Sequence, residues 1–357
     1  MDARRLAHNY AESSQRVVRR LRRASRRVLD RTRPYQQAAD AVLVKDELSP
    51  SAAFEMNGFC VLRQLFDADD LERIESDLVK EYGTDEFDKH LTACDAANRV
   101  STVSQLVFDS KLLGGVRSAL GNDVRFLQTS GMQANNDFVS WHRDSACRQV
   151  GGPDWDESAD RYIVAKSILY VRGTNTTLAV FPGSHVTEVT MDHMRQMDDA
   201  GQATVVEASE TANRRYTEDE MSRPMVLCAK AGDVVIFDQR MYHRGGRFDE
   251  ESKAVLTNKR QCQRGAEKLT LSWVFGAPNS HSERHYSYFR YARRDLSYRP
   301  INEELRGRLI DAGLYLGEAN YFHEHPDEVD AIWLRKPETR DDLKRKFAVA
   351  TVDSTIS

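Results

Sequence analysis

The chain has no apolar stretch of the ~18 to 20 residues that a helix needs to cross a bilayer, and no signal-peptide core follows its first residues. It also has no Cys-x-x-Cys pair. Its five cysteines are odd in number and widely spaced, which indicates reduced thiols rather than a disulfide framework. We therefore expect a cytoplasmic protein without a membrane segment.

A strong charge imbalance is absent as well. The chain has 51 Lys and Arg against 55 Asp and Glu, a formal net charge of −4, so no bulk electrostatic argument favours nucleic acid as a partner. Its 357 residues, of which 40% are hydrophobic, are enough for one large domain with a sizeable core.

The first 50 residues differ from the rest and are expected to form a basic helical extension followed by a linker. Within 16–29, Val17, Leu21, Ala24 and Val28 recur at helical spacing among arginines. We expect this helix to pack on the domain or on a second copy of the chain, which would give a homodimer. An acidic partner protein, and a nucleic acid or membrane surface, are the alternatives.

Two separated motifs have the layout of a two-histidine, one-carboxylate iron site. His142 and Asp144 are two residues apart, so in an extended segment both side chains point the same way. His243, about a hundred residues later, supplies a third ligand. Such a set leaves coordination positions open, as in non-haem Fe(II) oxygenases. The alternative is that His142 is a core histidine and Asp144 a turn residue.

The pattern of residues 124–275 predicts a series of short strands separated by Gly, Pro and Asn turns, which favours an all-β core with helical additions. That number of strands suits a double-stranded β-helix, or cupin-like jelly roll. The expected core strands are 124–133, 163–171, 178–181, 225–228, 234–237 and 268–275.

The order of these motifs resembles the phytanoyl-CoA dioxygenase-like family of Fe(II)/2-oxoglutarate oxygenases. The similarity runs from a strand expected at 54–62 and a helix at 68–78, through the His-x-Asp motif and Pro182-Gly-Ser-His185, to about Gly276. The resemblance implies that His142, Asp144 and His243 bind Fe(II) and that 2-oxoglutarate is the cosubstrate. Asp144 is retained, whereas halogenases of this class replace that carboxylate with a small residue.

The resemblance also implies a buried cation for the distal carboxylate of 2-oxoglutarate, and here the chain departs from the family pattern. The family places an arginine before the last core strand, and the apolar pattern of that strand aligns Lys268 with it. A lysine pairs with a carboxylate as a point charge without the bidentate fork. Arg264 is the second candidate and Lys166 the third. Polar contacts to 2-oxoglutarate are expected from Gln128, Thr129, Gln133 and Thr177.

These features predict one oxygenase domain over 51–357, with a jelly-roll core at about 120–280 and a helical C-terminal cover at 281–357. The expected reaction is hydroxylation, oxidative cyclisation or desaturation of a small molecule, in bacterial natural-product biosynthesis. Two alternatives stay open. One is a metal-dependent isomerase or epimerase on the same barrel, and the other is a non-catalytic module that acts through its basic N-terminal helix.

Overall fold

The structure is a computed structural model that describes residues 47–82, 91–134, 140–172, 176–189, 204–207, 212–249, 254–256, 268–293, 296, 298–318, 320–335 and 339–353. The chain divides into the unit Met1–Asp46 and the unit Glu47–Ser357. The basic helix expected in the first unit lies outside the described residues. Among the residues that are described, no helix combines the length and the apolar character needed to span a bilayer.

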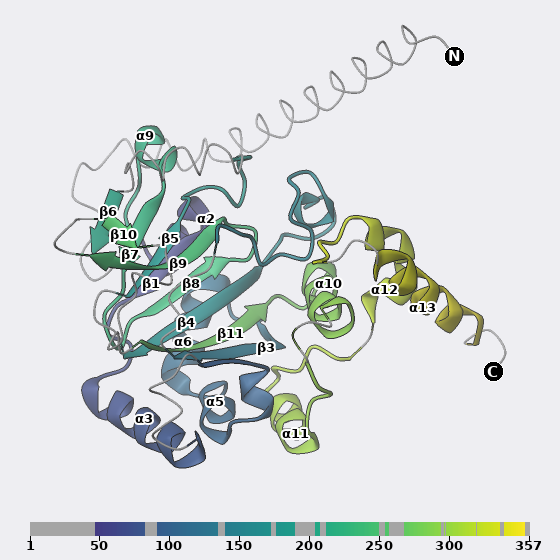
Figure 1. Ribbon diagram of the computed structural model, residues 1–357, viewed down its shortest axis with the longest axis horizontal. Helices are drawn as coiled ribbons and strands as arrows, with labels where there is room; N and C mark the ends of the chain where they lie inside the picture. The colour runs from purple at the N-terminus through teal and green to yellow at the C-terminus, as the bar shows by residue number, and fades with distance from the viewer. Residues whose placement is uncertain are drawn as a thin grey trace, which may run out of the picture. The chain divides into compact units, whose positions relative to one another are not determined.

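Two antiparallel-rich sheets form the centre of the larger unit (Figure 1). The six-stranded sheet has the order β1 (Phe59–Leu62), β8 (Val234–Asp238), β4 (Val164–Arg172), β11 (Leu269–Gly276), β3 (Arg125–Ala134), β2 (Leu91–Cys94). The five-stranded sheet has the order β10 (Ala254–Leu256), β9 (His243–Asp249), β5 (Thr176–Val180), β7 (Met225–Cys228), β6 (Thr204–Glu207). All six expected core strands are present, and the predicted jelly-roll fold is confirmed.

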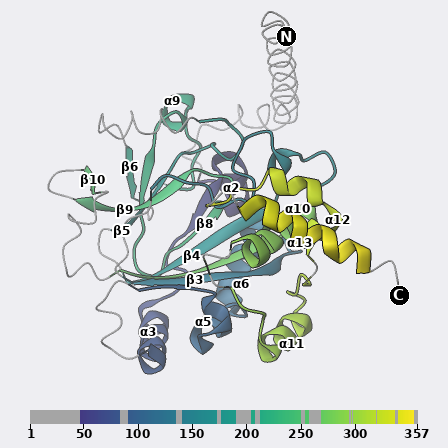
Figure 2. The ribbon, with the colours of Figure 1, turned by 45° about the vertical axis from the view of Figure 1, so that its right-hand side comes forward.

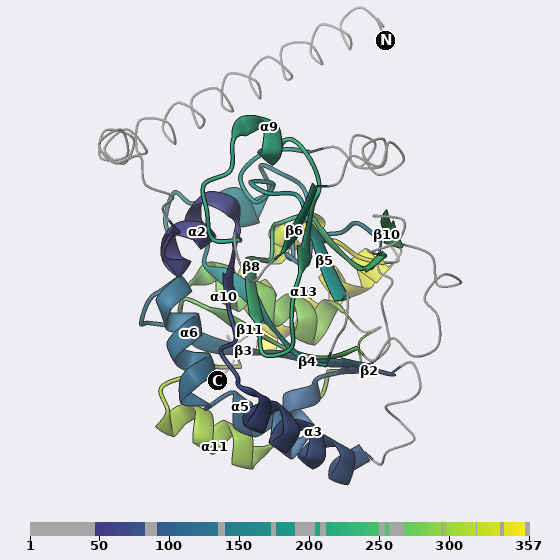
Figure 3. The ribbon, with the colours of Figure 1, turned by 90° about the vertical axis from the view of Figure 1, so that its left-hand side faces the viewer.

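Alternation along the strands of the larger sheet separates two hydrophobic cores. In β11, Leu269, Leu271 and Trp273 face the core shared with the helices. That helical layer contains α2 (Pro50–Asn57), α3 (Ala68–Tyr82), α5 (Ser101–Leu106), α6 (Ser110–Leu120) and α11 (Glu303–Asp311). Figure 3 shows these helices on one side of the sheet. The opposite face packs on the smaller sheet, where Tyr170 and Phe237 meet Leu178.

The expected strand at 54–62 is wrong at its start. Residues 50–57 form helix α2, and strand β1 begins at Phe59. Pro50 occupies the first turn, where its missing N–H costs nothing, and Ser49 caps the helix. Gly58 ends it in the left-handed conformation with φ 82°. The apolar residues alone resembled a strand because a helix of eight residues shows little periodicity.

A second group of helices lies beyond β11. It contains α10 (Ser280–Ser287), a π-helical turn η3 (Tyr288–Ala292), α12 (Tyr321–Glu324) and α13 (Arg340–Asp353). Figure 2 shows α10, α12 and α13 side by side. Apolar side chains of η3, α12 and α13 form one cluster with Ala146 and Cys147. The C-terminal helices therefore pack directly on the loop that follows Asp144.

Candidate metal centre

Backbone pairing brings the two halves of the predicted site together. His142 and His243 exchange two hydrogen bonds, each N–H donating to the other carbonyl at 3.0 Å. The N–H groups of Asp144 and Ser145 both donate to the carbonyl of Gln239, at 3.0 and 2.8 Å. The loop with the His-x-Asp motif is thus fixed against the segment between β8 and β9.

The three side chains converge on one point. Nε2 of His142 lies 3.3 Å from Oδ1 of Asp144, and Nε2 of His243 lies 3.5 Å from Oδ2. One ligand atom from each residue falls within 4.8 Å of the others. His243 is buried, whereas His142 and Asp144 are half-buried, so the cluster is open on one side.

Both histidines are held in the tautomer that a metal requires. Nδ1 of His142 lies 2.8 Å from the carbonyl oxygen of Ser140, and Nδ1 of His243 lies 3.1 Å from that of Met241. A carbonyl oxygen only accepts, so each Nδ1 carries the proton and each Nε2 has its lone pair directed towards Asp144. This second hydrogen bond is typical of metal-binding histidines.

The electrostatics keep His243 and Asp144 in their metal-binding protonation states. Burial, with a smaller contribution from His142, lowers the pKa of His243 to about 4, so the imidazole of His243 is neutral near pH 7. Burial acts to raise the pKa of Asp144, but Lys166 and the two histidines outweigh it and hold that pKa well below the usual range. These two residues therefore offer a neutral imidazole and a carboxylate to a metal ion.

This donor set fits a ferrous ion. Two ligand atoms bound at right angles, each ~2.1 Å from an ion, are about 3 Å apart. The His–Asp separations of 3.3 and 3.5 Å are close to that value. Mixed nitrogen and oxygen donors suit Fe(II), and three protein ligands leave room for a cosubstrate.

The three candidate cations have different positions. Lys166 on β4 lies at the cluster, with Nζ 3.0 Å from Oδ2 of Asp144. Lys268 is buried immediately before β11. By alternation it lies on the same face as Thr270, towards the smaller sheet and away from the helices. Arg264 lies outside the described residues.

The predicted polar contacts are divided between the two faces of β3. Gln128 has a positive φ of 55° and lines a small cavity with Phe126 and Ser130 on the helix-covered side. Its side-chain amide donates to the carbonyl of Gly317. Thr129, between Gln128 and Ser130, is buried and faces the other way. Gln133 also lies in β3, whereas Thr177 lies in β5 and its side chain is outside what the structure describes.

Arg143 is a site residue that the sequence did not identify as important. Its buried guanidinium lies between the rings of Tyr242 and Trp155, 3.9 and 5.0 Å from their centroids. It donates to the carbonyls of Arg148 and Ser184, each at 2.9 Å. Burial lowers its pKa to about 10. Arg143 thus stabilises the loop that carries Asp144. The only sequence feature that could have indicated this role is its position between two of the candidate metal ligands.

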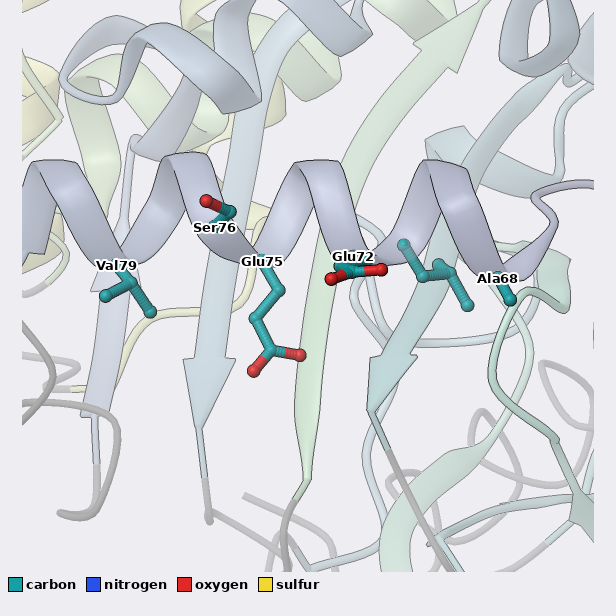
Figure 4. A pocket seen from close by; sticks show the side chains of 6 residues that line it. Ala68, Glu72, Glu75, Ser76 and Val79 are labelled. Atoms are coloured by element: carbon teal, nitrogen blue, oxygen red, sulfur yellow. The ribbon is translucent and has the colours of Figure 1, made fainter.

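A surface hollow along α3 is unrelated to this centre (Figure 4). The residues that line it all belong to α3: Ala68, Leu71, Glu72, Glu75, Ser76 and Val79. One of its carboxylates, Glu75, is paired with Arg172 at 3.3 Å. None of these six lining residues is a histidine, and none belongs to the His–Asp–His cluster.

Comparison with known proteins gives one family and several solved structures. The family model described as phytanoyl-CoA dioxygenase (PhyH) matches residues 54–249. No curated protein matches the chain.

The structures that are similar show low identity. HygX from Streptomyces hygroscopicus, with nickel and 2-oxoglutarate bound, is 16% identical, with 66% of this chain and 88% of that chain covered and a TM-score of 0.42. The epimerase SnoN, in complex with Fe3+, α-ketoglutarate and nogalamycin RO, is 12% identical, with 64% and 82% covered and a TM-score of 0.41. EctD from S. alaskensis, with 2-oxoglutarate and 5-hydroxyectoine, is 15% identical, with 66% and 79% covered and a TM-score of 0.40.

Proposed function

The chain belongs to the phytanoyl-CoA dioxygenase family, whose members are Fe(II)- and 2-oxoglutarate-dependent oxygenases, and we propose that its His142, Asp144 and His243 hold the iron. The protein is therefore an oxygenase with Fe(II) and 2-oxoglutarate as cofactor and cosubstrate. The observation that carries the ligand assignment is the convergence of three donor atoms within 4.8 Å, with both histidine tautomers set by backbone carbonyls.

When bound, the iron supplies the chemistry that couples oxidation of 2-oxoglutarate by oxygen to oxidation of a substrate carbon. The chain's own residues orient the ligands and limit access of water. Phe237 packs against the ring of His243 with centroids 4.6 Å apart, which shields that imidazole. Asp144 supplies the one negative charge of the ligand set. Because a carboxylate is retained here, hydroxylation, oxidative cyclisation or desaturation is favoured over halogenation.

For 2-oxoglutarate, Lys268 is the proposed partner of the distal carboxylate. Its burial on the face between the two sheets supports this role, because a buried ammonium is stable when it meets an anion. Thr129, which faces the same way from β3, is proposed as a polar contact. Lys166, which pairs with Asp144 at the metal cluster, is an alternative anchor.

We propose a small-molecule substrate, as the family's namesake reaction on phytanoyl-CoA suggests, and a place in natural-product biosynthesis. The substrate carbon to be oxidised would approach from the side where His142 and Asp144 are half-buried. The identity of the oxidised carbon is set by residues beyond the metal ligands.

The test of the ligand assignment uses the purified full chain. Under anaerobic conditions Fe(II) and 2-oxoglutarate should give the weak visible absorption of chelated iron, and oxygen should then produce succinate. His142→Ala and His243→Ala should each abolish the absorption and the succinate. The matched control is His323→Ala, a histidine of α12 that belongs to no ligand cluster. Succinate formation at the normal rate in His243→Ala would refute the assignment.

A further inference from the structure

The loop with the first two proposed metal ligands ends at an arginine that lies flat on a tryptophan. The guanidinium carbon of Arg148 is 3.7 Å from the ring centroid of Trp333. The backbone N–H of Trp333 donates to the carbonyl of Ala146 at 2.8 Å, which fixes the backbone of this residue against the loop of Asp144. The indole ring forms a platform for the guanidinium.

A second arginine shares this platform. The guanidinium of Arg293 lies 5.4 Å from the ring centroid of Trp333 and 5.9 Å from that of Tyr288. Arg293 follows directly on η3, and single π-helical turns are frequent at functional sites. Two guanidinium groups on one indole repel each other, so an anion between them would be stabilised.

Arg148 differs from Arg284 and Arg240, two buried arginines whose charges are balanced by carboxylates. Arg284 pairs with Asp154 and Glu328, and Arg240 pairs with Asp238 and Glu157. These carboxylates outweigh burial and raise the pKa of both arginines.

For Arg148, no such carboxylate lies at ion-pair distance in the part of the chain that the structure describes. Its Nε is buried without a hydrogen-bond partner, and burial lowers its pKa. A buried donor left without a hydrogen-bond partner is costly, unless a ligand supplies one.

These residues adjoin the loop of the proposed metal ligands. Arg148 is four residues after Asp144, and Tyr288 packs in one apolar cluster with Ala146 of the same loop. His285 of α10 is 1% exposed, and neither ring nitrogen has a hydrogen-bond partner. Its ring packs on Phe289 at 4.7 Å. Unsatisfied polar groups thus gather on the side of the centre that the C-terminal helices cover.

We propose that Arg148 on Trp333, together with Arg293, binds an anionic group of the substrate, a carboxylate or a phosphate. This inference rests on the proposed function, because the anchored group would place the substrate carbon beside the metal ligands. The planar fork of a guanidinium matches both oxyanions in a bidentate manner. Arg293 and Trp333 lie outside the matched family region 54–249, so the family match covers only Arg148 of this proposed site.

The first arm of the test measures anion binding with sulfate as the probe. Sodium sulfate is titrated into the metal-free full chain at constant ionic strength, and tryptophan fluorescence is recorded. We expect the fluorescence of the unaltered protein to change in a saturable manner. The sulfate concentration at the midpoint should be at least tenfold higher in Arg148→Gln and should rise by a smaller factor in Arg148→Lys. Trp333→Phe should show no fluorescence change. Lys230→Gln, an exposed lysine, is the matched control and should keep the normal midpoint.

The second arm tests whether Arg148 binds an anionic group of the substrate or the distal carboxylate of 2-oxoglutarate. Arg148→Gln should form the absorption of the Fe(II)–2-oxoglutarate complex at the same 2-oxoglutarate concentration as the unaltered protein. A requirement raised tenfold would show that Arg148 binds the cosubstrate and would overturn the substrate assignment. An unchanged sulfate midpoint in Arg148→Gln, or no saturable response in the unaltered protein, would overturn the site itself.

If Arg148→Gln does not fold, Arg293→Gln is measured in both arms with the same expectations. Because the first arm uses metal-free protein, failure of the iron assignment leaves the anion result readable. Conversely, if anion binding is absent while the absorption of the iron complex is normal, only this inference is refuted and the iron assignment stands.

Discussion

Nζ of Lys166 lies 3.0 Å from Oδ2 of Asp144, the same carboxylate oxygen that is 3.5 Å from Nε2 of His243. The lysine reaches this carboxylate from β4, a core strand of the larger sheet. Its positive charge has two opposite consequences. It stabilises the half-buried carboxylate when no metal is present, and it repels a divalent cation that binds the same oxygen.

Lys166→Met should therefore bind metal more tightly while folding less stably without it. Two unit charges ~5 Å apart interact by about 3 kcal/mol at an effective dielectric constant near 20. We expect the dissociation constant for Ni(II) or Fe(II) to fall about tenfold, allowing for screening. The melting temperature of the metal-free protein should decrease by several degrees. Anaerobic metal titration and thermal denaturation measure these two quantities.

Lys80→Met is the control for this prediction, because Lys80 lies on the exposed face of α3 with 71% of its side chain accessible. It should change neither quantity. Weaker metal binding in Lys166→Met would mean that the lysine orients Asp144 for the metal rather than competing with it.

The proposed 2-oxoglutarate anchor gives a second prediction. Lys268→Ala should raise the half-saturating concentration of 2-oxoglutarate at least tenfold, because the distal carboxylate loses its buried counter-charge. Lys268→Arg should recover part of the affinity. Succinate formation against 2-oxoglutarate concentration is the measurement, with Lys230→Ala as an exposed-lysine control. If Lys268→Ala behaves normally while Lys166→Met loses affinity for 2-oxoglutarate, the anchor is Lys166.

A pH-dependent contribution to stability is expected from Glu220. Its carboxylate accepts hydrogen bonds from Arg214 and from the N–H of Thr217, at the start of α9 (Glu218–Met221). The hydrogen bond from Arg214 and then that from Thr217 lower the pKa of Glu220 to about 2, from an ordinary value of 4.5. Because the folded-state pKa is the lower one, this stabilisation is complete above pH 4.5 and is lost as the pH falls towards 2.

The Glu220→Gln variant should accordingly have a lower melting temperature than the unaltered protein at pH 7. The difference between the two melting temperatures should shrink as the pH falls from 4.5 to 2. The pair is partly solvent-exposed, so the effect should be at most about 1 kcal/mol. Melting curves collected from pH 2 to 7 test this, with Glu283→Gln, an exposed glutamate of α10, as the control. A difference that grows on acidification would contradict the assignment.

The metal cluster could be predicted from the sequence because its residues belong to short motifs of a few consecutive residues. His142 and Asp144 are two residues apart, and the apolar pattern of β8 leads directly to His243. The six core strands were predictable for the same reason, since alternation is a property of a few consecutive residues. The family resemblance supplied the order in which these strands form a jelly roll.

What surrounds the cluster was not predictable, because it depends on residues far apart in the chain. Lys166 reaches Asp144 from a strand that begins twenty residues later, and Trp333 reaches Arg148 across 185 positions. No periodicity encodes such pairs. The tautomers of His142 and His243 are likewise set by backbone carbonyls, which leave no signature in the residue types.

The last prediction concerns Arg143, which holds the Asp144 loop without touching the ligands. Arg143→Met keeps the length of the side chain but removes the donors to the carbonyls of Arg148 and Ser184. An unsatisfied buried carbonyl costs about 1–3 kcal/mol, so the protein should melt several degrees lower. Because outer residues orient the ligands, metal affinity should fall about tenfold. Titration with Ni(II) and thermal denaturation in its presence and absence measure both effects.

The control is Arg161→Met, which changes an exposed arginine paired with Glu55 and should leave both the metal affinity and the melting temperature unchanged. Normal metal affinity in Arg143→Met would mean that the backbone hydrogen bonds to Gln239 suffice to hold the loop, and that the buried arginine only fills the space between Tyr242 and Trp155.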